Sequence, residues 1–181
     1  MNKFALISLL TVVLVLFNCT CLLAYESNVI VGFEVQGNQL IDEKIILLNI
    51  AEKIGDTLSA QAVQDDIARI GEMGYFSYVG AEVKTDGTGK KVVFNVEENA
   101  IVGDIVIKGC TKVKNEILLD AMESKIGTVF NSKLLTQDIQ HVNDALGREG
   151  YLFSKVSDAY VQDQGSKIDI EITEGILADV K

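Results

Sequence analysis

The sequence contains no proline, one histidine and few basic residues. The absence of proline argues against proline-rich spacers or recognition tracts. Lysine and arginine number 16 against 26 aspartate and glutamate residues, so the formal net charge is -10. A protein that binds a nucleic-acid backbone needs a surplus of basic side chains on one face, and the sequence has no such run. Nucleic acid is therefore excluded as a partner.

Patterns for catalysis or metal binding are equally scarce. We interpret the single histidine, His141, as a solvated residue off the apolar stripe of its helix, because a metal site needs more nitrogen or sulfur ligands. The stretch DGTGKK at 86–91 lacks the spacing of a phosphate-binding loop and predicts a hairpin turn instead. Adjacent acids such as Asp65 and Asp66 are explained by solvation. The sequence predicts no catalytic, cofactor-binding or metal residue, and no enzyme.

Cysteine is also rare. Cys19 and Cys21 lie near the start of the chain, which leaves Cys110 alone in the remainder. A single thiol cannot form an intramolecular disulfide, so this part of the chain must rely on its core for stability. We interpret Cys110 as a small residue in the turn after a strand, because only Lys108 and Lys112 lie beside it as activating groups.

Residues 1–24 have the pattern of a secretory signal peptide. Lys3 supplies a short positive start, residues 4–17 are almost wholly apolar, and Ala24 is a small residue suited to cleavage. Two alternatives stay open, an uncleaved anchor and lipid attachment at one of the two cysteines. Residues 4–24 are long enough for an anchor, since a helix rising about 1.5 Å per residue would cross a ~30 Å hydrocarbon core. All three interpretations place the remainder outside the cytoplasm.

Residues 29–100 predict a first folding unit with the order β-α-α-β-β. Alternating apolar residues indicate strands, and capping residues followed by apolar stripes indicate helices. The residues that carry this pattern are Val31, Phe33 and Val35 in the first strand, Asp42 with Ile45, Ile46, Leu48 and Ile50 in the first helix, Ser59 with Val63, Ile67 and Ile70 in the second helix, and 79–83 and 92–96 in the hairpin.

Residues 101–175 predict a second unit that repeats the first. The apolar and glycine pattern returns 72 residues later, and after the second helix the offset becomes 76. Four extra residues are about one helical turn, so they lengthen the helix without rotating its stripe of Leu135, Ile139, Val142 and Leu146. The short gap at 98–104 predicts a stiff junction. The residues that define the repeat are Gly37, Gly55, Gly74 and Tyr75, matched by Gly109, Gly127, Gly150 and Tyr151.

This pattern resembles the polypeptide-transport-associated (POTRA) domain. The shared features are a Gly-Asn turn after the first strand, the breaks IGDT at 54–57 and IGTV at 126–129, and the GYF or GYL motif before the hairpin. The junction VVFNVEENAIVGDIVIKGCTKV is similar to the BamA type, in the family of outer-membrane β-barrel assembly factors. Cys110 departs from the asparagine frequent in that family. The family's C-terminal barrel has no counterpart here, and we expect 176–181 to begin a further unit or to form a tail.

The expected fold is α+β, with two helices packed on one face of a three-stranded sheet in each unit. The resemblance implies that the first strand of each hairpin, about 78–84 and 154–161, is an edge that accepts an extended peptide as an added strand. The other interpretation of these segments is a plain solvated edge. The candidate peptide-binding residues are Tyr78, Val79, Ala81, Val83, Val156 and Tyr160.

The resemblance also implies a location and partners. It implies a scaffold on the periplasmic face of the outer membrane that binds unfolded outer-membrane proteins, accessory assembly proteins and a transmembrane barrel on the same or a neighbouring chain, without a cofactor. Two alternatives remain open: an inner-membrane-anchored interaction module of the division-protein type, and the POTRA region of a two-partner secretion or TamA-type transporter.

Overall fold

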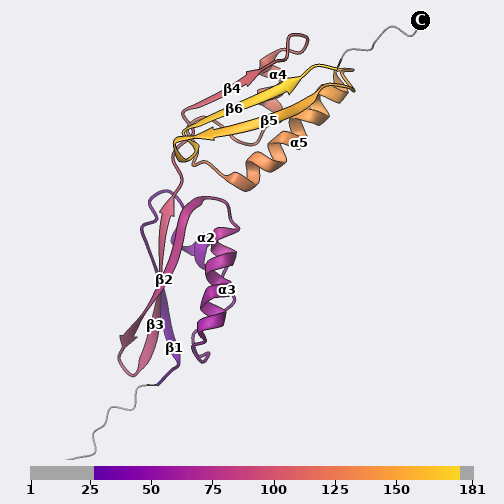
Figure 1. The fold of residues 1–181 in the computed structure, drawn as a ribbon. Coiled ribbons are helices and arrows are strands. Elements are labelled where there is room, and N and C mark those ends of the chain that lie inside the picture. Colours follow the sequence, from indigo (N-terminus) through magenta and orange to yellow (C-terminus); the bar gives the residue numbers. More distant parts are fainter. Residues whose placement is uncertain (1–26, 176–181) are drawn as a thin grey trace, which may run out of the picture.

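The computed structural model describes residues 27–175 (Figure 1). The predicted signal peptide and the predicted start of a further unit at 176–181 lie outside the described residues. Within the described part, no helix is both long enough and apolar enough to cross a membrane.

The first unit contains one three-stranded sheet with its helices on one face (Figure 1). The central strand, β3, pairs in parallel with β1 and antiparallel with β2. A parallel pair needs a long crossover, which the two helices supply. The elements are β1 (Ile30–Gln36), α2 (Glu43–Leu47), α3 (Ala60–Gly71), β2 (Phe76–Asp86) and β3 (Gly89–Glu98).

The second unit has the same topology, with the strand order β4-β6-β5. Its hairpin closes through a short 3-10 helix, η1, where the first unit has a two-residue turn. The elements are β4 (Asp104–Lys108), α4 (Asn115–Ala121), α5 (Ser132–Arg148), β5 (Lys155–Gln162), η1 (Asp163–Gly165) and β6 (Lys167–Thr173). The predicted α+β class with two tandem β-α-α-β-β units is confirmed.

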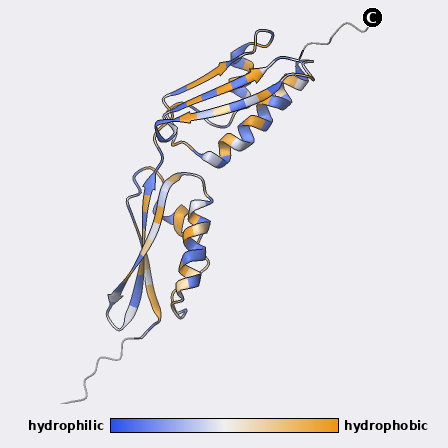
Figure 2. Ribbon diagram, viewed as in Figure 1, coloured by the Kyte–Doolittle hydropathy of each residue, from blue (hydrophilic) through white to orange (hydrophobic). Residues whose placement is uncertain are grey.

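Each unit has its own core between sheet and helices, where the apolar faces of the elements meet (Figure 2). In the first unit Phe94 is fully buried, and its ring stacks on Phe33 with the ring centroids 6.4 Å apart. The predicted helix stripes are confirmed, since Val63, Ile70 and Val142 are buried. The predicted lengthening of the second helix in the second unit agrees with the structure, in which α3 has 12 residues and α5 has 17.

Two local predictions in the first unit are wrong. Val31 is 42% exposed and does not join Phe33 on the core face, because a register shift between Ile30 and Gly32 reverses the alternation and buries Ile30 instead. The first helix begins after its predicted cap Asp42 but is only five residues long. Ile46 is its only buried residue, and the apolar side chains at 45 and 48 face solvent.

Hydrogen bonds join the two units at the predicted junction. Asn131, the N-cap of α5, accepts from the first turn of its own helix through Oδ1, and its Nδ2 donates to the carbonyl of Met73 at 2.8 Å. The Ser132 amide donates to the carbonyl of Gly74 at 3.0 Å. Asn99 bridges both sides, because its Nδ2 donates to the carbonyls of Gly74 and Phe130, each at 3.0 Å. We call this set of contacts the joint.

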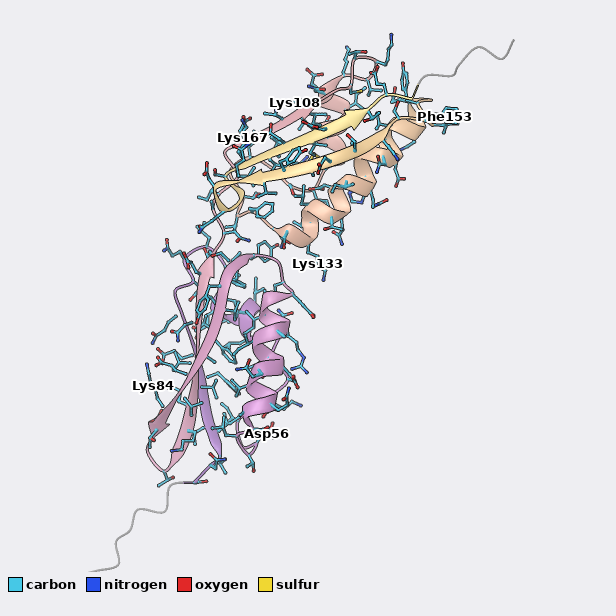
Figure 3. All side chains as sticks on the ribbon, viewed as in Figure 1. Asp56, Lys84, Lys108, Lys133, Phe153 and Lys167 are labelled. Atoms are coloured by element: carbon cyan, nitrogen blue, oxygen red, sulfur yellow. The ribbon has the colours of Figure 1, made fainter. Side chains whose placement is uncertain are left out.

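The joint places the start of α5 beside the end of the first unit, as Lys133 marks in Figure 3. A groove of about 380 Å³ runs along it, lined by Leu40 and Tyr75 from the first unit and by Val129 and Leu134 from the second. The joint gives the stiffness predicted from the short gap a physical basis, and the stiffness itself stays a prediction.

Candidate peptide-binding edges

The outer edge of β2 presents a row of backbone groups that β3 does not use. The predicted hairpin turn is confirmed, because Asp86 pairs with Gly89 across two residues. In such a hairpin the pairs alternate between those that exchange hydrogen bonds and those that do not. The Thr85–Lys90 pair does not, since the Lys90 amide donates to Val29 on the other side.

Three of the predicted residues lie, like Thr85, in pairs that exchange no hydrogen bonds with β3. Counting back in twos from Thr85, the pairs of Val83, Ala81 and Val79 with β3 are also of the kind without mutual hydrogen bonds. Their N–H and C=O groups therefore point away from the sheet. Within residues 27–175 no partner for these three amides is present. An extended peptide laid along β2 would find a regular set of donors and acceptors.

The side chains of β2 divide between the two faces of the sheet. Val79 and Ala81 pack on the core beneath the helices, whereas Val83 is 45% exposed beyond them. Tyr78 lies on the open face, 58% exposed, with its ring over Gly80. The edge thus offers an exposed aromatic ring on one face and a partly exposed apolar side chain on the other.

The corresponding edge of β5 is partly occupied. The Val156 amide donates to Oδ1 of Asn143 on α5 at 2.8 Å. The Ala159 amide donates to Oδ1 of its neighbour Asp158, also at 2.8 Å. Tyr160 is 47% exposed, and its hydrogen bond to Asp158 raises the pKa of the phenol. A peptide could add along β5 only by displacing two side chains.

The structure therefore separates the six predicted residues. Tyr78, Val79, Ala81 and Val83 lie together on β2, and Val156 and Tyr160 lie on a different sheet whose edge is partly covered. Asn143, which occupies the second edge, was not predicted. Its position one residue after the apolar Val142 gives no sign that its amide reaches back to a strand.

The other outer strands, β1 and β4, are also partly covered. The β1 amides of Val35 and Ile30 donate to the Glu43 carboxylate at 3.2 Å and to the Asp56 carbonyl at 2.9 Å. On β4, the carbonyl of Ile107 accepts from Nδ2 of Asn115 at 3.3 Å. Among the four outer strands that the structure describes, β2 has the most open edge.

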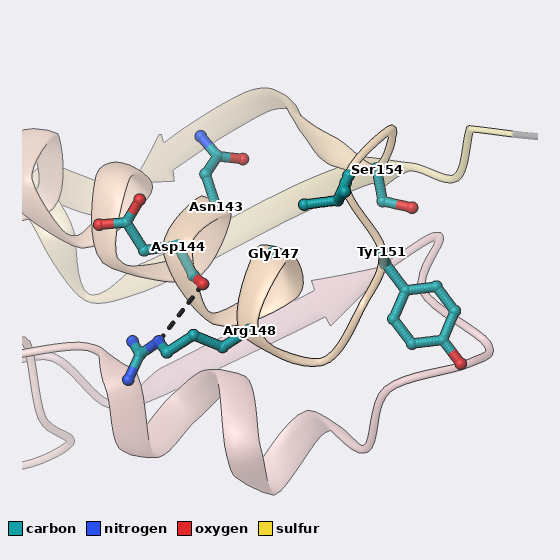
Figure 4. Close-up of a pocket in the computed structure, with 7 residues that line it drawn as sticks. Asn143, Asp144, Gly147, Arg148, Tyr151 and Ser154 are labelled. Atoms are coloured by element: carbon teal, nitrogen blue, oxygen red, sulfur yellow. Dashed lines mark hydrogen bonds between the residues drawn. The ribbon is translucent and has the colours of Figure 1, made fainter.

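A hollow of about 620 Å³ lies beside the C-terminal end of α5 (Figure 4). Asn143, Tyr151 and Ser154 line it together with Arg148, whose Nε donates to the Asp144 carbonyl at 3.3 Å. Ser154 also accepts from the Gly175 amide at 3.4 Å. Asn143, Arg148 and Ser154 thus already make hydrogen bonds within the second unit.

Two buried aspartates were missed. Asp66 is fully buried and not solvated as predicted, because its carboxylate accepts from the amides of Ala51 and Glu52 in the loop between the helices. Asp138 does the same for Glu123 and Ser124 in the second unit. The two aspartates are 72 residues apart, so the repeat itself was the signal that could have identified them.

A glutamate fixes the turn after the first strand in each unit. Oε1 of Glu98 accepts from the amides of residues 39–41, with distances from 2.8 to 3.0 Å. Glu174 accepts in the same way from Thr111 and Lys112. The bond from the Thr111 amide lowers the pKa of the Glu174 carboxyl. The acidic residue that ends each repeat is therefore structural.

The single histidine and the cysteine of the described residues lie at least partly inside the second unit. His141 is half-buried, and its Nδ1 is buried with no hydrogen-bond partner within the described part of the chain. Cys110 lies in the turn after β4, as predicted, packed on the core with Sγ 3.7 Å from the Val113 carbonyl. Residues 27–175 contain no group of three or more side chains able to hold a metal ion.

A family model described as "POTRA: Surface antigen variable number repeat" matches residues 29–99 and again residues 100–175. Among curated proteins, the outer membrane protein assembly factor BamA of Nitratidesulfovibrio vulgaris is 36% identical over 141 residues, which are 78% of this chain and 18% of that protein. The chloroplastic outer envelope protein 80 of Arabidopsis thaliana is 28% identical over 127 residues, 70% of this chain and 17% of that protein. The chain thus spans less than a fifth of the length of these two relatives.

Solved structures share the fold. The N-terminal domain of Omp85 from Thermosynechococcus elongatus superposes with a TM-score of 0.69 at 21% identity, covering 82% of this chain and 63% of that one. The structure of POTRA1-3 of the periplasmic domain of Omp85 from Anabaena gives a TM-score of 0.62, also at 21% identity, over 82% of this chain and 62% of that one.

Proposed function

Because this chain belongs to the POTRA family, we propose that its two units form a scaffold for outer-membrane protein assembly and bind unfolded clients at the edge of β2. The observation that supports this most directly is the row of outward amides at Val79, Ala81 and Val83, which have no partner within residues 27–175. Added strands are held mainly by main-chain hydrogen bonds, so one edge can accept many client sequences.

The proposed location is the periplasmic face of the outer membrane. It is supported by the relative from Nitratidesulfovibrio vulgaris, whose name states a role in outer membrane protein assembly. The proposed partners are unfolded outer-membrane proteins, accessory assembly proteins and a transmembrane barrel on the same or a neighbouring chain. Such a scaffold needs no catalytic group and no cofactor, because its work is to hold an extended segment.

A proline at Val83 tests the proposal. It removes one outward N–H and leaves the hydrogen bonds between β2 and β3 in place, because the Val83–Val92 pair does not exchange any. The probe is a ten-residue peptide of alternating apolar and polar residues, crosslinked from a photoreactive group at Tyr78. Loss of one hydrogen bond of ~1 kcal/mol corresponds to about fivefold weaker binding.

The matched control is Val161→Pro at the edge of β5, which should leave crosslinking at Tyr78 unchanged. Circular dichroism of both variants checks that the sheets remain folded. Val83→Pro protein that is folded and still crosslinks at the wild-type level would contradict binding along β2.

A further inference from the structure

A pocket of about 300 Å³ lies in the second unit beside β4, an outer strand of its sheet (Figure 1). Its apolar walls are the side chains of Ile105, Leu119 and Ile126, of which the first two pack on the core and the third is 62% exposed. Two exposed residues of opposite charge, Asp120 and Lys125, complete the lining, so the pocket favours neither charge. Its volume is at the lower end for ligand sites, about 300–1,000 Å³, and suits one large uncharged side chain.

The pocket contains a buried hydroxyl group without a hydrogen bond. Ser124 lines the pocket and is only 5% exposed, and its Oγ has no partner within residues 27–175. The backbone of Ser124 is held in place, because its amide donates to Oδ2 of Asp138 at 3.1 Å. An unpaired buried hydroxyl costs free energy, so a ligand that brings a polar atom to Ser124 gains from pairing with it.

Ile105 also offers free backbone groups at the outer edge of β4. Ile107, two residues further on, turns its carbonyl outward to accept from Nδ2 of Asn115 at 3.3 Å. Backbone groups in a strand alternate in direction with a period of two, so the N–H and C=O of Ile105 also point outward. Neither group has a partner within the described residues.

The open stretch of this edge is one residue long. Before β4, the Val102 amide donates to the Thr128 carbonyl, and the Val102 carbonyl accepts from the Gly127 amide, each at 2.8 Å. After Ile105, the carbonyl of Ile107 is taken by Asn115, as described above. The edge can therefore exchange a full pair of backbone hydrogen bonds with only one residue of an extended segment.

A residue bonded to Ile105 would place its side chain in the pocket. Residues directly opposite each other in an antiparallel pair have their side chains on the same face of the sheet. The Ile105 side chain lies on the face covered by the helices, since it packs on the core and lines the pocket. The backbone groups and the pocket therefore form a single site for one residue.

The first unit does not repeat this site. By the offset of 72, Phe33 stands in place of Ile105 and Glu52 in place of Ser124. The larger ring of Phe33, which stacks on Phe94, takes up room that is open beside Ile105, and a carboxylate replaces the uncharged hydroxyl. The site is thus a property of the second unit.

We propose that this site binds a tyrosine in an extended segment of a partner protein. The N–H and C=O of the tyrosine bond to Ile105, its ring packs against Leu119 and Ile126, and its phenol pairs with the hydroxyl of Ser124. Tyrosine fits better than phenylalanine or leucine, because its side chain ends a large apolar ring with an uncharged polar group. The site is separate from the edge of β2 and does not depend on binding there.

The test is an NMR titration that follows the isoleucine and leucine methyl groups of the protein. The probes are two five-residue peptides with blocked ends, serine-threonine-X-threonine-serine, in which X is tyrosine or phenylalanine. The methyl signals of Ile105, Leu119 and Ile126 should shift, and the tyrosine peptide should bind about fivefold more tightly because it makes one more hydrogen bond. Ser124→Ala should lower the affinity for the tyrosine peptide to that for the phenylalanine peptide, which should itself stay unchanged.

Two further variants separate the pocket from the rest of the molecule. Ile105→Phe introduces the residue of the first unit and should abolish the shifts of Leu119 and Ile126 with both peptides, because the larger ring fills the pocket. Val83→Pro should bind the tyrosine peptide as the wild-type protein does, and circular dichroism checks that all variants are folded. Equal binding of the two peptides by the wild-type protein, a preference for tyrosine that persists in Ser124→Ala, or unchanged shifts in Ile105→Phe would overturn the proposal.

Discussion

The two hairpin edges, β2 in the first unit and β5 in the second, hold equivalent places in their sheets but differ in what their backbones can still bind. On β2 the outward amides of Val79, Ala81 and Val83 have no partner within the described residues. On β5 the amides of Val156 and Ala159 already donate to Asn143 and Asp158. The side-chain amide of Asn143 on α5 and the carboxylate of Asp158 on β5 account for the difference.

This difference shows that a repeated topology does not repeat a binding property. Natural sheets cover or charge their edges to prevent unwanted pairing, and β5 is protected in this way while β2 is open. The second unit has instead its exposed apolar side chains, Leu152 and Phe153, at the end of the unit.

The largest expected effect tests what the two units share. Asp66→Ala and Asp138→Ala should each destabilise their own unit by about 3 kcal/mol, because each leaves two loop amides without an acceptor. Denaturant unfolding followed by fluorescence of a label in each unit measures the loss. Asp65→Ala, at the exposed neighbouring position, should stay within about 0.5 kcal/mol of wild type. A loss as small as this for Asp66→Ala would contradict the structural role.

Because only Gly74 lies in the joint, substitutions at the equivalent residues Gly74 and Gly150 should differ in their cost to stability. Gly74→Ala and Gly150→Ala both place a side chain at positive φ, which costs about 1–2 kcal/mol. Gly74→Ala also displaces the cap residue Asn131, which adds ~1 kcal/mol. The free energies of unfolding of the two variants of the 181-residue chain give this difference. Equal losses would mean that the joint contributes nothing to stability.

Asn143→Ala should weaken the contrast between the edges. Removing the side-chain oxygen frees the Val156 amide, at a cost to stability of about 1 kcal/mol. Hydrogen exchange at Val156 should become faster, and a photoreactive group at Tyr160 should gain crosslinking to the alternating peptide. Unchanged exchange at Val156 would show that Asn143 does not protect this edge.

The smallest effect concerns pH and the open faces of the sheets. The hydrogen bond from Lys108 lowers the pKa of Asp169, and the bond from Gln36, followed by that from Lys91, lowers the pKa of Glu34. A carboxyl whose folded pKa is lowered stabilises the fold above its unfolded pKa, and this stability is lost as the pH falls through the lowered folded pKa. Asp169 is nearly buried and Glu34 is more exposed, so Asp169→Asn should flatten the stability profile between pH 7 and 3 more than Glu34→Gln does. Acid titrations followed by circular dichroism compare the two, and an equal or larger change for Glu34→Gln would contradict this ranking.

Much of the fold could be predicted, because periodicity and capping act locally. Ser59 and Asp42 begin helices as their side chains require, and the stripe of Val63 and Ile70 is buried. The register shift that exposes Val31 could not be predicted, since a bulge depends on how β1 pairs with a strand about 60 residues away.

The positions of the candidate edges could be predicted, but which of the two edges is open to a peptide could not. The resemblance to the POTRA domain identified β2 and β5 as outer strands, yet whether their backbone groups are free depends on side chains from other parts of the fold. Asn143 contacts β5 from 13 residues away, and the carboxylate of Asp66 contacts a loop 15 residues away. Such contacts follow from the packing of helix against strand, which a linear pattern does not encode.

The central claim is that β2 is the edge that accepts an extended peptide, and a backbone-amide NMR titration with the alternating peptide tests it most directly. The account predicts that the amide signals of Val79, Ala81 and Val83 shift and become protected from exchange, while those of Val156 and Ala159 stay unchanged. Shifts confined to β5, or shifts that leave all of β2 unchanged, would contradict it.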